Sequence, residues 1–351
     1  MQVLNLIVAF IISLILVPLN RKLSIKLGVV SYPRERDAHK EPTPRMGGLS
    51  VVISFVVSVI IFMFFTQDIN ITKCIFITIG AIVLGVVGVI DDIYQIKPYQ
   101  KMAGQIIAIT LAIIGGVNVR FLVYETPGII AILVKCLNIF GTYFWTLGMI
   151  NAINLIDGLD GLSSGVSTIA AISFMVIAVT NGNTLAMLLA VSIAGATLGF
   201  LAYNFHPAKI FIGDTGSMLL GYTLALIALE TGFEYLNVVC FAAPIAILAV
   251  PIFDTAYAII RRIINRIPIT EADKNHTHHK LMRKGFKYRT VVLILYAFCI
   301  LFGFTGVCIS RTQSTKFIIL AVLLILILMC LIYEKKDKKS IAEERKKNDK
   351  K

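Results

Sequence analysis

Long apolar segments, separated by short polar loops, follow one another along the whole chain. Most are near twenty residues long, the length that a helix rising about 1.5 Å per residue needs to cross a hydrocarbon layer of about 30 Å. Such helices satisfy their own backbone hydrogen bonds in lipid, and we find no series of short alternating strands typical of a barrel. The pattern predicts an all-α integral membrane protein with eleven transmembrane helices, at residues 3–19, 47–65, 73–92, 100–117, 129–150, 163–181, 184–203, 215–231, 238–260, 291–309 and 316–333.

Composition supports this fold class. Of the 351 residues, 57% are hydrophobic and 15% are charged, whereas an average soluble domain has about 25% charged residues. We therefore expect residues 1–333 to form one polytopic membrane domain and residues 334–351 to form a basic, disordered cytoplasmic tail. The six cysteines form no Cys-x-x-Cys pair and are interpreted as small hydrophobic side chains.

The basic residues predict the orientation of the helices. With alternate loops assigned to one side, 28 of the Lys and Arg residues fall on that side and five on the other. Because basic loops stay in the cytoplasm, the N-terminus is expected outside and the C-terminus in the cytoplasm of a multi-pass plasma-membrane protein. The net charge of +13 lies mainly in these loops and the tail, so the expected partner is the lipid bilayer and no nucleic acid is expected.

Acidic residues gather beside the predicted cytoplasmic loops. Asp91 and Asp92 end one apolar segment, and Lys97 and Lys101 follow at the start of the next helix. Adjacent carboxylates raise each other's pKa unless a cation lies between them. The pair therefore predicts a divalent metal ion or a cationic substrate group at this border.

A second loop has the sequence NAINLIDGLDGLSSG. It places Asn151, Asn154, Asp157 and Asp160 at three-residue intervals, with glycines at 158, 161 and 165. This spacing puts the polar groups on one helical face, and the glycines permit close backbone approach. Because no Lys or Arg lies within the loop and unpaired carboxylates beside lipid are costly, a site for donors or metal is favoured over a structural loop.

A third loop, YNFHPAKIFIGDTGS, contains Asn204, His206 and Lys209 and ends at Asp214. Asp214 opens the next helix, where a carboxylate can be a simple N-cap. The functional alternative, which we favour, is a metal ligand beside a helix N-terminus that also holds phosphate oxygens. For His206, loop packing and catalysis both stay open.

Three histidines, His276, His278 and His279, lie among the nine basic residues of the longest loop. A structural zinc site usually needs four ligands, often including cysteine, so a clamp on phosphate groups is the better interpretation. Asp254 lies inside the preceding apolar segment, where a hydrogen bond between helices and a functional role are both considered.

The first loop, SYPRERDAHKEPTPRMGG, offers His39, Lys40 and Arg45 beside a Pro-rich turn. Alone, these residues would be interpreted as positive-inside anchors.

Taken in order, four motifs closely resemble the polyprenyl-phosphate N-acetylhexosamine-1-phosphate transferase family, across about residues 39 to 281: VIDDIYQIKPYQKMAGQ, NAINLIDGLDGLSSG, YNFHPAKIFIGDTGS and HTHHKL. The His-x-His-His form, with Thr277 at its second position, and the PTPRMGG loop look like the branch that uses UDP-N-acetylglucosamine. In the phospho-MurNAc-pentapeptide translocase branch, the motif has three consecutive histidines and the protein has ten helices.

The resemblance implies that N-acetylglucosamine-1-phosphate passes from UDP-N-acetylglucosamine to undecaprenyl phosphate on the cytoplasmic face, giving undecaprenyl-diphosphate-N-acetylglucosamine and UMP. This is the first step of a surface glycan, for which teichoic acid is favoured over O-antigen. Mg²⁺ is the expected cofactor, with Mn²⁺ as an alternative, and a homodimer is considered as a partner. The alternatives are phospho-MurNAc-pentapeptide transfer and, in another class, a membrane transporter.

The resemblance also implies roles for individual residues. Asp214 would be the main metal ligand, with Asp91 and Asp92 at the metal or on the attacking phosphate, and direct attack by the lipid phosphate is favoured over a covalent intermediate. The expected catalytic residues are Asp91, Asp92, Asp214 and His279. The expected substrate-binding residues are His39, Lys40, Lys101, Asn151, Asn154, Asp157, Asp160, Asn204, Phe211, His276 and His278.

Overall fold

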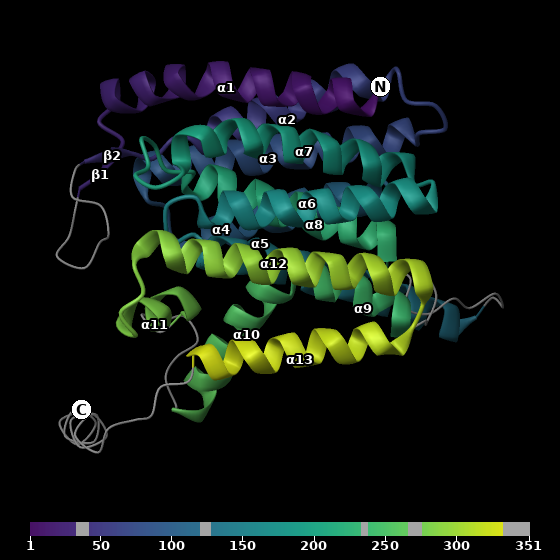
Figure 1. Ribbon diagram of the computed structural model, residues 1–351. Coiled ribbons are helices and arrows are strands. Elements are labelled where there is room, and N and C mark those ends of the chain that lie inside the picture. The colour runs from purple at the N-terminus through teal and green to yellow at the C-terminus, as the bar shows by residue number, and fades with distance from the viewer. Residues whose placement is uncertain (33–41, 120–127, 233–237, 266–275, 333–351) are drawn as a thin grey trace.

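The computed structural model describes residues 1–32, 42–119, 128–232, 238–265 and 276–332, and these residues are almost entirely helical (Figure 1). His39, Lys40 and the tail 334–351 lie outside the described residues. The elements in chain order are α1 Gln2–Lys26, β1 Val30–Ser31, β2 Thr43–Pro44, α2 Gly48–Met63, α3 Ile71–Tyr94, α4 Pro98–Ile114, α5 Ile129–Ile156, α6 Leu162–Asn181, α7 Thr184–Asn204, α8 Gly213–Gly232, α9 Val238–Ile247, α10 Ala249–Ile264, α11 Thr277–Arg283, α12 Tyr288–Thr312 and α13 Thr315–Ile332.

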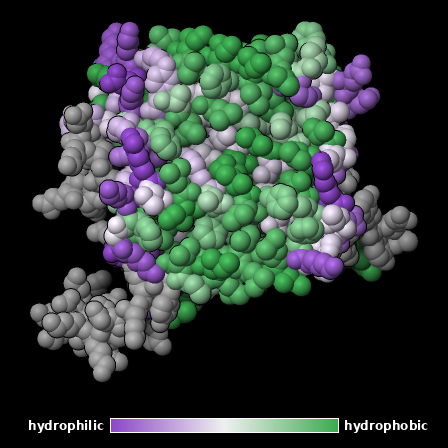
Figure 2. Space-filling model, in the orientation of Figure 1, coloured by the Kyte–Doolittle hydropathy of each residue, from purple (hydrophilic) through white to green (hydrophobic). Residues whose placement is uncertain are grey.

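The long helices run side by side and form an apolar bundle. Among the described residues, seven helices are long and apolar enough to cross a membrane, or eight if the bent pair α9 and α10 counts as one span. Figure 2 shows the corresponding surface, a broad apolar band with hydrophilic side chains at its two opposite ends. The chain is therefore an all-α, multi-pass membrane protein. Every predicted segment overlaps a helix, while the count of eleven spans and the orientation stay predictions.

Helix α8 lies at the centre of the bundle. It packs against α2, α3, α5, α6 and α7, and nearly all of its side chains are buried. Helix α3 approaches it closely at Gly88, where an added Cβ would lie 2.3 Å from the Cα of Thr215. Small residues allow such contacts between helices in a membrane. The N-terminus of α8, which carries Asp214, is consequently fixed by its neighbours.

The predicted helix 238–260 is wrong as one continuous element. Phe241–Ile247 and Ala249–Ile264 form two helices bent by 84°. Pro251 is the third residue of α10 and has no N–H to donate to the preceding turn, which favours a bend at this point. The bend brings Asp254 of α10 against His276 and Thr277 at the start of α11.

The first and third loops lie together at one end of the bundle. Strands β1 and β2 pair antiparallel, and the chain after β2 continues along the segment before α8. Gly47 N–H donates to the Phe211 carbonyl at 2.9 Å, and Phe211 N–H donates to the Pro44 carbonyl at 2.8 Å. Figure 1 shows β1, β2 and α11 at the end opposite to the start of α1.

Candidate active site

Asp92 holds the N-terminus of α8. Its Oδ1 accepts a hydrogen bond from Asp214 N–H at 2.9 Å, and its Oδ2 accepts from the N–H and the hydroxyl of Thr215 at 3.2 and 2.6 Å. A carboxylate at this position caps free N–H groups, and its negative charge is stabilised by the positive end of the helix dipole. Gly213 makes room for it at φ +65°, because an added Cβ would lie 2.6 Å from both Asp92 carboxylate oxygens. Asp92 therefore caps a helix that is distant in sequence.

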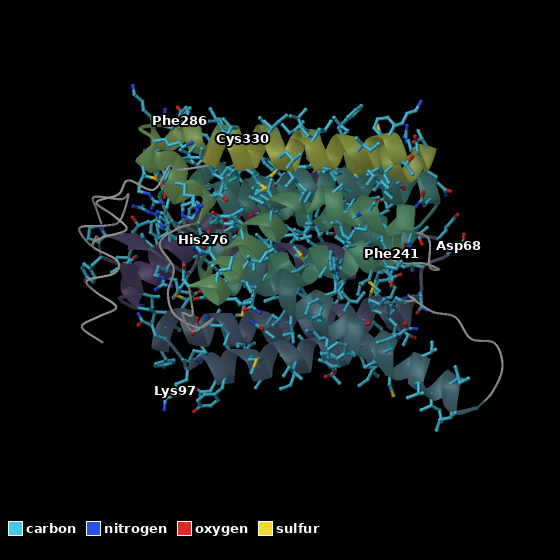
Figure 3. The ribbon with its side chains drawn as sticks, turned by 90° about the horizontal axis from the view of Figure 1, so that it is seen from below. Asp68, Lys97, Phe241, His276, Phe286 and Cys330 are labelled. Carbon is cyan, nitrogen blue, oxygen red and sulfur yellow. The ribbon has the colours of Figure 1, made fainter. Side chains whose placement is uncertain are left out.

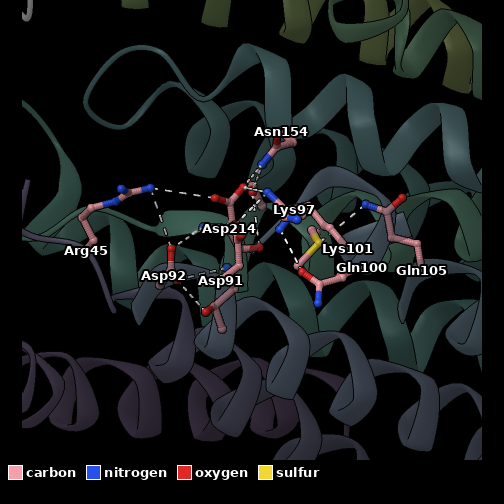
Figure 4. Close-up of polar contacts among 12 residues, drawn as sticks. Arg45, Asp91, Asp92, Lys97, Gln100, Lys101, Gln105, Asn154 and Asp214 are labelled. Carbon is pink, nitrogen blue, oxygen red and sulfur yellow. Dashed lines mark hydrogen bonds and ion pairs between the residues drawn. The ribbon is translucent and has the colours of Figure 1, made fainter. Parts of the chain in front are cut away.

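Asp91 points to a different partner. Lys101 Nζ lies 2.7 Å from Asp91 Oδ2 and 3.1 Å from Asp214 Oδ1, so one ammonium joins the two carboxylates (Figure 4). Asn154 Nδ2 donates to the same Asp214 oxygen and, at 2.8 Å, to Ser217 Oγ. The structure thus brings predicted site residues from three loops into direct contact.

Arg45 approaches the cluster from the opposite side to Lys101 (Figure 4). Its guanidinium lies 3.8 Å from Asp214 Oδ2 and 4.0 Å from Asp92 Oδ1. Two cations therefore flank Asp214, one from the first loop and one from α4.

Asp157 follows the last residue of α5. Its Oδ1 accepts a hydrogen bond from Ser163 Oγ at 2.6 Å. Burial and the nearby Asp214 carboxylate raise the pKa of the Asp157 carboxyl, the bond from Ser163 lowers it, and the net result is a pKa of about 7. Asn151, by contrast, is exposed and donates to the Leu147 carbonyl of its own helix at 2.7 Å.

Asn204 connects the second and third loops. Its Oδ1 accepts from Gly161 N–H at 3.0 Å and from Ser164 Oγ at 2.8 Å, and its Nδ2 donates to the Ile210 carbonyl at 3.0 Å. The side chain is 3% exposed, so its polar atoms already have partners within the protein.

Asp160 connects the same two loops. Its Oδ2 lies 2.8 Å from His206 Nδ1 and accepts from Ala208 N–H at 3.1 Å, while its own N–H donates to the Tyr288 hydroxyl. The His206 ring stacks on Tyr288 with 4.2 Å between ring centroids. Of the two alternatives for His206, these contacts favour loop packing.

Asp254 holds the start of the histidine segment. Its Oδ2 lies 2.8 Å from His276 Nδ1, and its Oδ1 accepts from the N–H and the hydroxyl of Thr277 at 2.6 Å each. Asp254 is 2% exposed. The bent helix α10 thereby fixes α11 through one buried carboxylate, and Figure 3 places His276 toward the same end as Lys97.

His278 lies against the second loop. An added Cβ at Gly158 would be 2.5 Å from His278 Nε2, so the imidazole covers the backbone next to Asp157. Burial lowers the pKa of His278 to about 3, with a further contribution from His279, whose ring centroid is 4.2 Å away. The imidazole is therefore neutral at physiological pH.

Two charged residues of this site were outside the predicted set, Arg45 and Asp254. Each had a signal in the sequence, since Arg45 lies in the PTPRMGG loop and Asp254 is a charge inside an apolar segment. No signal in the sequence pointed to the hydroxyls of Thr215, Ser163 and Ser217, because their contacts depend on which helices pack together. Phe211 is half-buried, and its segment is held beside the cluster by the hydrogen bond from Phe211 N–H to the Pro44 carbonyl of β2.

Known proteins are similar in sequence to this chain over most of its length. Residues 74–232 match the model of glycosyl transferase family 4. A probable undecaprenyl-phosphate N-acetylglucosaminyl 1-phosphate transferase of Bacillus subtilis (strain 168) is 37% identical over 328 residues, covering 92% of this chain and 90% of the relative.

Two further relatives carry other names. A decaprenyl-phosphate N-acetylglucosaminephosphotransferase of Mycolicibacterium smegmatis is 34% identical, over 79% of this chain and 74% of the relative. A phospho-N-acetylmuramoyl-pentapeptide-transferase of Staphylococcus saprophyticus is 30% identical, over 88% and 98%. The chain therefore belongs to glycosyl transferase family 4, the polyprenyl-phosphate N-acetylhexosamine-1-phosphate transferases, and is a membrane phosphoglycosyltransferase.

Proposed function

We propose that this protein transfers N-acetylglucosamine-1-phosphate from UDP-N-acetylglucosamine to undecaprenyl phosphate, releasing UMP. One observation carries the proposal: Asp91 and Asp214 meet between Lys101 and Arg45 at one end of an apolar bundle. Two phosphate-bearing molecules repel each other, and fixed cations near the reacting oxygens reduce that repulsion. A location at the membrane border lets a lipid phosphate meet a water-soluble donor.

We infer that the carboxylates of Asp91 and Asp214 hold Mg²⁺ or Mn²⁺. Mg²⁺ is usually held by one or two carboxylates together with substrate phosphates, and these two carboxylates already converge on one cation. No group of three His, Cys, Asp or Glu in the described ranges is arranged to hold a metal, so phosphate oxygens would complete the shell. When bound, the ion would neutralise developing charge on the phosphates.

Asp92 has a different proposed role. Its carboxylate oxygens both accept hydrogen bonds from the start of α8, so it positions Asp214 and leaves the metal to Asp91 and Asp214. Asn204 and Asp160 likewise hold the second and third loops together around the proposed binding site of the nucleotide sugar.

In the proposed reaction, an oxygen of the lipid phosphate forms a bond to the β-phosphorus of the nucleotide sugar. The bond from that phosphorus to the bridging oxygen breaks, and UMP leaves with the electron pair. A phosphate monoester has a second pKa of about 6 and is largely ionised at neutral pH, so direct attack needs no strong base. Lys101 and the histidine segment donate hydrogen bonds to the diphosphate.

The sugar assignment has separate support. By resemblance, Thr277 in the His-x-His-His motif marks the UDP-N-acetylglucosamine branch; its N–H and its hydroxyl both donate to Asp254. The name of the Bacillus subtilis relative agrees with this branch, and that of the Staphylococcus saprophyticus relative supports the pentapeptide alternative. Family membership argues against a transporter. We favour a teichoic acid pathway on resemblance.

The donor is tested with purified protein, undecaprenyl phosphate and Mg²⁺. UMP release is measured separately with UDP-N-acetylglucosamine, UDP-N-acetylgalactosamine and UDP-MurNAc-pentapeptide. We expect the highest kcat/KM with UDP-N-acetylglucosamine. Turnover confined to UDP-MurNAc-pentapeptide would replace the proposal with its alternative.

A further inference from the structure

The backbone of Arg45 is fixed relative to α8. Arg45 N–H donates to the Val29 carbonyl at 3.2 Å, and Pro44 and Gly47 on either side of it both bond to Phe211. Its carbonyl oxygen would lie 2.4 Å from a Cβ added at Gly213, which shows how closely the two loops pack. The side chain therefore starts from a defined point beside Asp214.

The guanidinium of Arg45 faces carboxylates without forming a hydrogen bond to them. Its distances of 3.8 and 4.0 Å to Asp214 and Asp92 exceed the usual N–H···O range of about 2.7–3.2 Å. No hydrogen bond from this guanidinium to any other residue of the described chain is present. Its Nη2 lies nearest to the two carboxylates, its five N–H donors are not used in hydrogen bonds within the described chain, and the side chain is 31% exposed.

Lys101 provides the comparison. Its ammonium lies 2.7 and 3.1 Å from Asp91 and Asp214, so two of its three N–H donors already face carboxylates of the protein. Loose ion pairs at a partly exposed position contribute little free energy. Of the two cations beside Asp214, Arg45 therefore gives up less interaction free energy with the protein when it binds a new anion.

We propose that Arg45 is a further substrate-binding residue, whose guanidinium binds a phosphate oxygen of the reacting molecules. The planar guanidinium suits phosphate because it can donate two parallel hydrogen bonds. The phosphate belongs either to the nucleotide diphosphate or to the lipid. This inference rests on the proposed function and extends it to the first loop.

The test compares Arg45→Gln and Arg45→Lys with the wild type, using UMP release to determine kcat and KM for each substrate. Arg21→Gln is the matched control, since Arg21 is exposed and its Nε donates to the Lys209 carbonyl at 3.2 Å. Hydrogen bonds to charged groups contribute about 1.5–3 kcal/mol, so Arg45→Gln should lower kcat/KM roughly 10- to 100-fold. Arg45→Lys should fall between this variant and the wild type, and the control should match the wild type.

The substrate whose KM rises identifies the source of the phosphate. Binding of UDP and of a short-chain polyprenyl phosphate is also measured directly, and Arg45→Gln should weaken one of them. The binding measurement does not depend on catalysis. Absence of UMP release by the wild type would therefore contradict the proposed function without deciding whether Arg45 binds phosphate.

A merely structural role would lower the unfolding temperature and spare binding. Free guanidinium ion should partly restore the activity of Arg45→Ala if the side chain contacts phosphate. Unchanged binding of both ligands by Arg45→Gln overturns the inference, as does lost activity that tracks a lowered unfolding temperature without rescue by guanidinium.

Discussion

At the residue scale, two adjacent aspartates make different contacts. Successive residues of a helix point about 100° apart, so Asp91 meets Lys101 while Asp92 meets the start of α8. The sequence predicted that both acids lie at the site, but their division of roles depends on where α8 packs. That placement is a tertiary property, which a motif does not contain.

Substitution of these two residues should have different effects. Asp92→Ala removes a helix cap, so we expect it to reduce the free energy of unfolding by about 1 kcal/mol and to retain part of the activity. Asp91→Asn removes a proposed metal ligand, so we expect it to keep the stability and to lose at least about 100-fold in kcat. Thermal unfolding in detergent and UMP release measure the two effects. Full activity of Asp91→Asn would contradict these roles.

Divalent metal binding should depend on nucleotide. Because the protein offers Asp91 and Asp214 and the substrate supplies the other oxygens, Mg²⁺ should bind weakly alone and more tightly with UDP present. Isothermal titration of Mg²⁺ with and without UDP measures this difference, and Asp214→Asn should abolish it. Equal Mg²⁺ affinity in both titrations would argue against the proposed ligand set.

At the element scale, the bend between α9 and α10 determines where the histidine segment lies. Asp254 on α10 bonds to His276 and Thr277, and Lys284 Nζ donates to the Leu331 carbonyl at the end of α13. Proline in an apolar segment allows a bend, but its direction is set by the helices around it. The sequence therefore predicted the loop and its histidines without predicting which carboxylate holds them.

His278 should contribute a loss of stability in mild acid. Its pKa is lowered to about 3 in the folded protein, against about 6.5 when unfolded, so below that pH the unfolded chain takes up a proton that the folded protein does not. This contribution is absent above about pH 6.5 and destabilises the fold by about 1.4 kcal/mol for each pH unit below it. The Asp157 carboxyl, whose pKa is raised to about 7, contributes a slope of opposite sign in the same range, so the test is the difference between two proteins. Between pH 7 and 5 the wild type should lose more stability, or gain less, than His278→Gln in thermal unfolding. Equal slopes would refute the assignment.

At the scale of the whole molecule, the described parts of four loops that are distant in sequence gather at one end of the apolar bundle. Loop charge was enough to predict this shared face, because it depends only on alternation of helices and loops. The contacts of Arg45 with Asp214 and of His278 with Gly158 were not predictable in this way, because they arise from close packing of helices and loops.

The orientation can be tested by cysteine labelling. Asp68 and Lys97 are exposed and lie at opposite ends of the bundle (Figure 3). In a variant with the six native cysteines replaced by serine, a membrane-impermeant maleimide should label Asp68→Cys in intact cells. Lys97→Cys should react only after permeabilisation. The reverse pattern would invert the predicted topology.

The central claim is that the carboxylates around Asp214 support phosphosugar transfer. The most direct measurement incubates purified protein with UDP-N-acetylglucosamine, undecaprenyl phosphate and Mg²⁺ and quantifies both UMP and the lipid product. The wild type should form equal amounts of UMP and undecaprenyl-diphosphate-N-acetylglucosamine, and a folded Asp214→Asn variant should form neither. Wild-type rates of product formation by that variant would contradict the account.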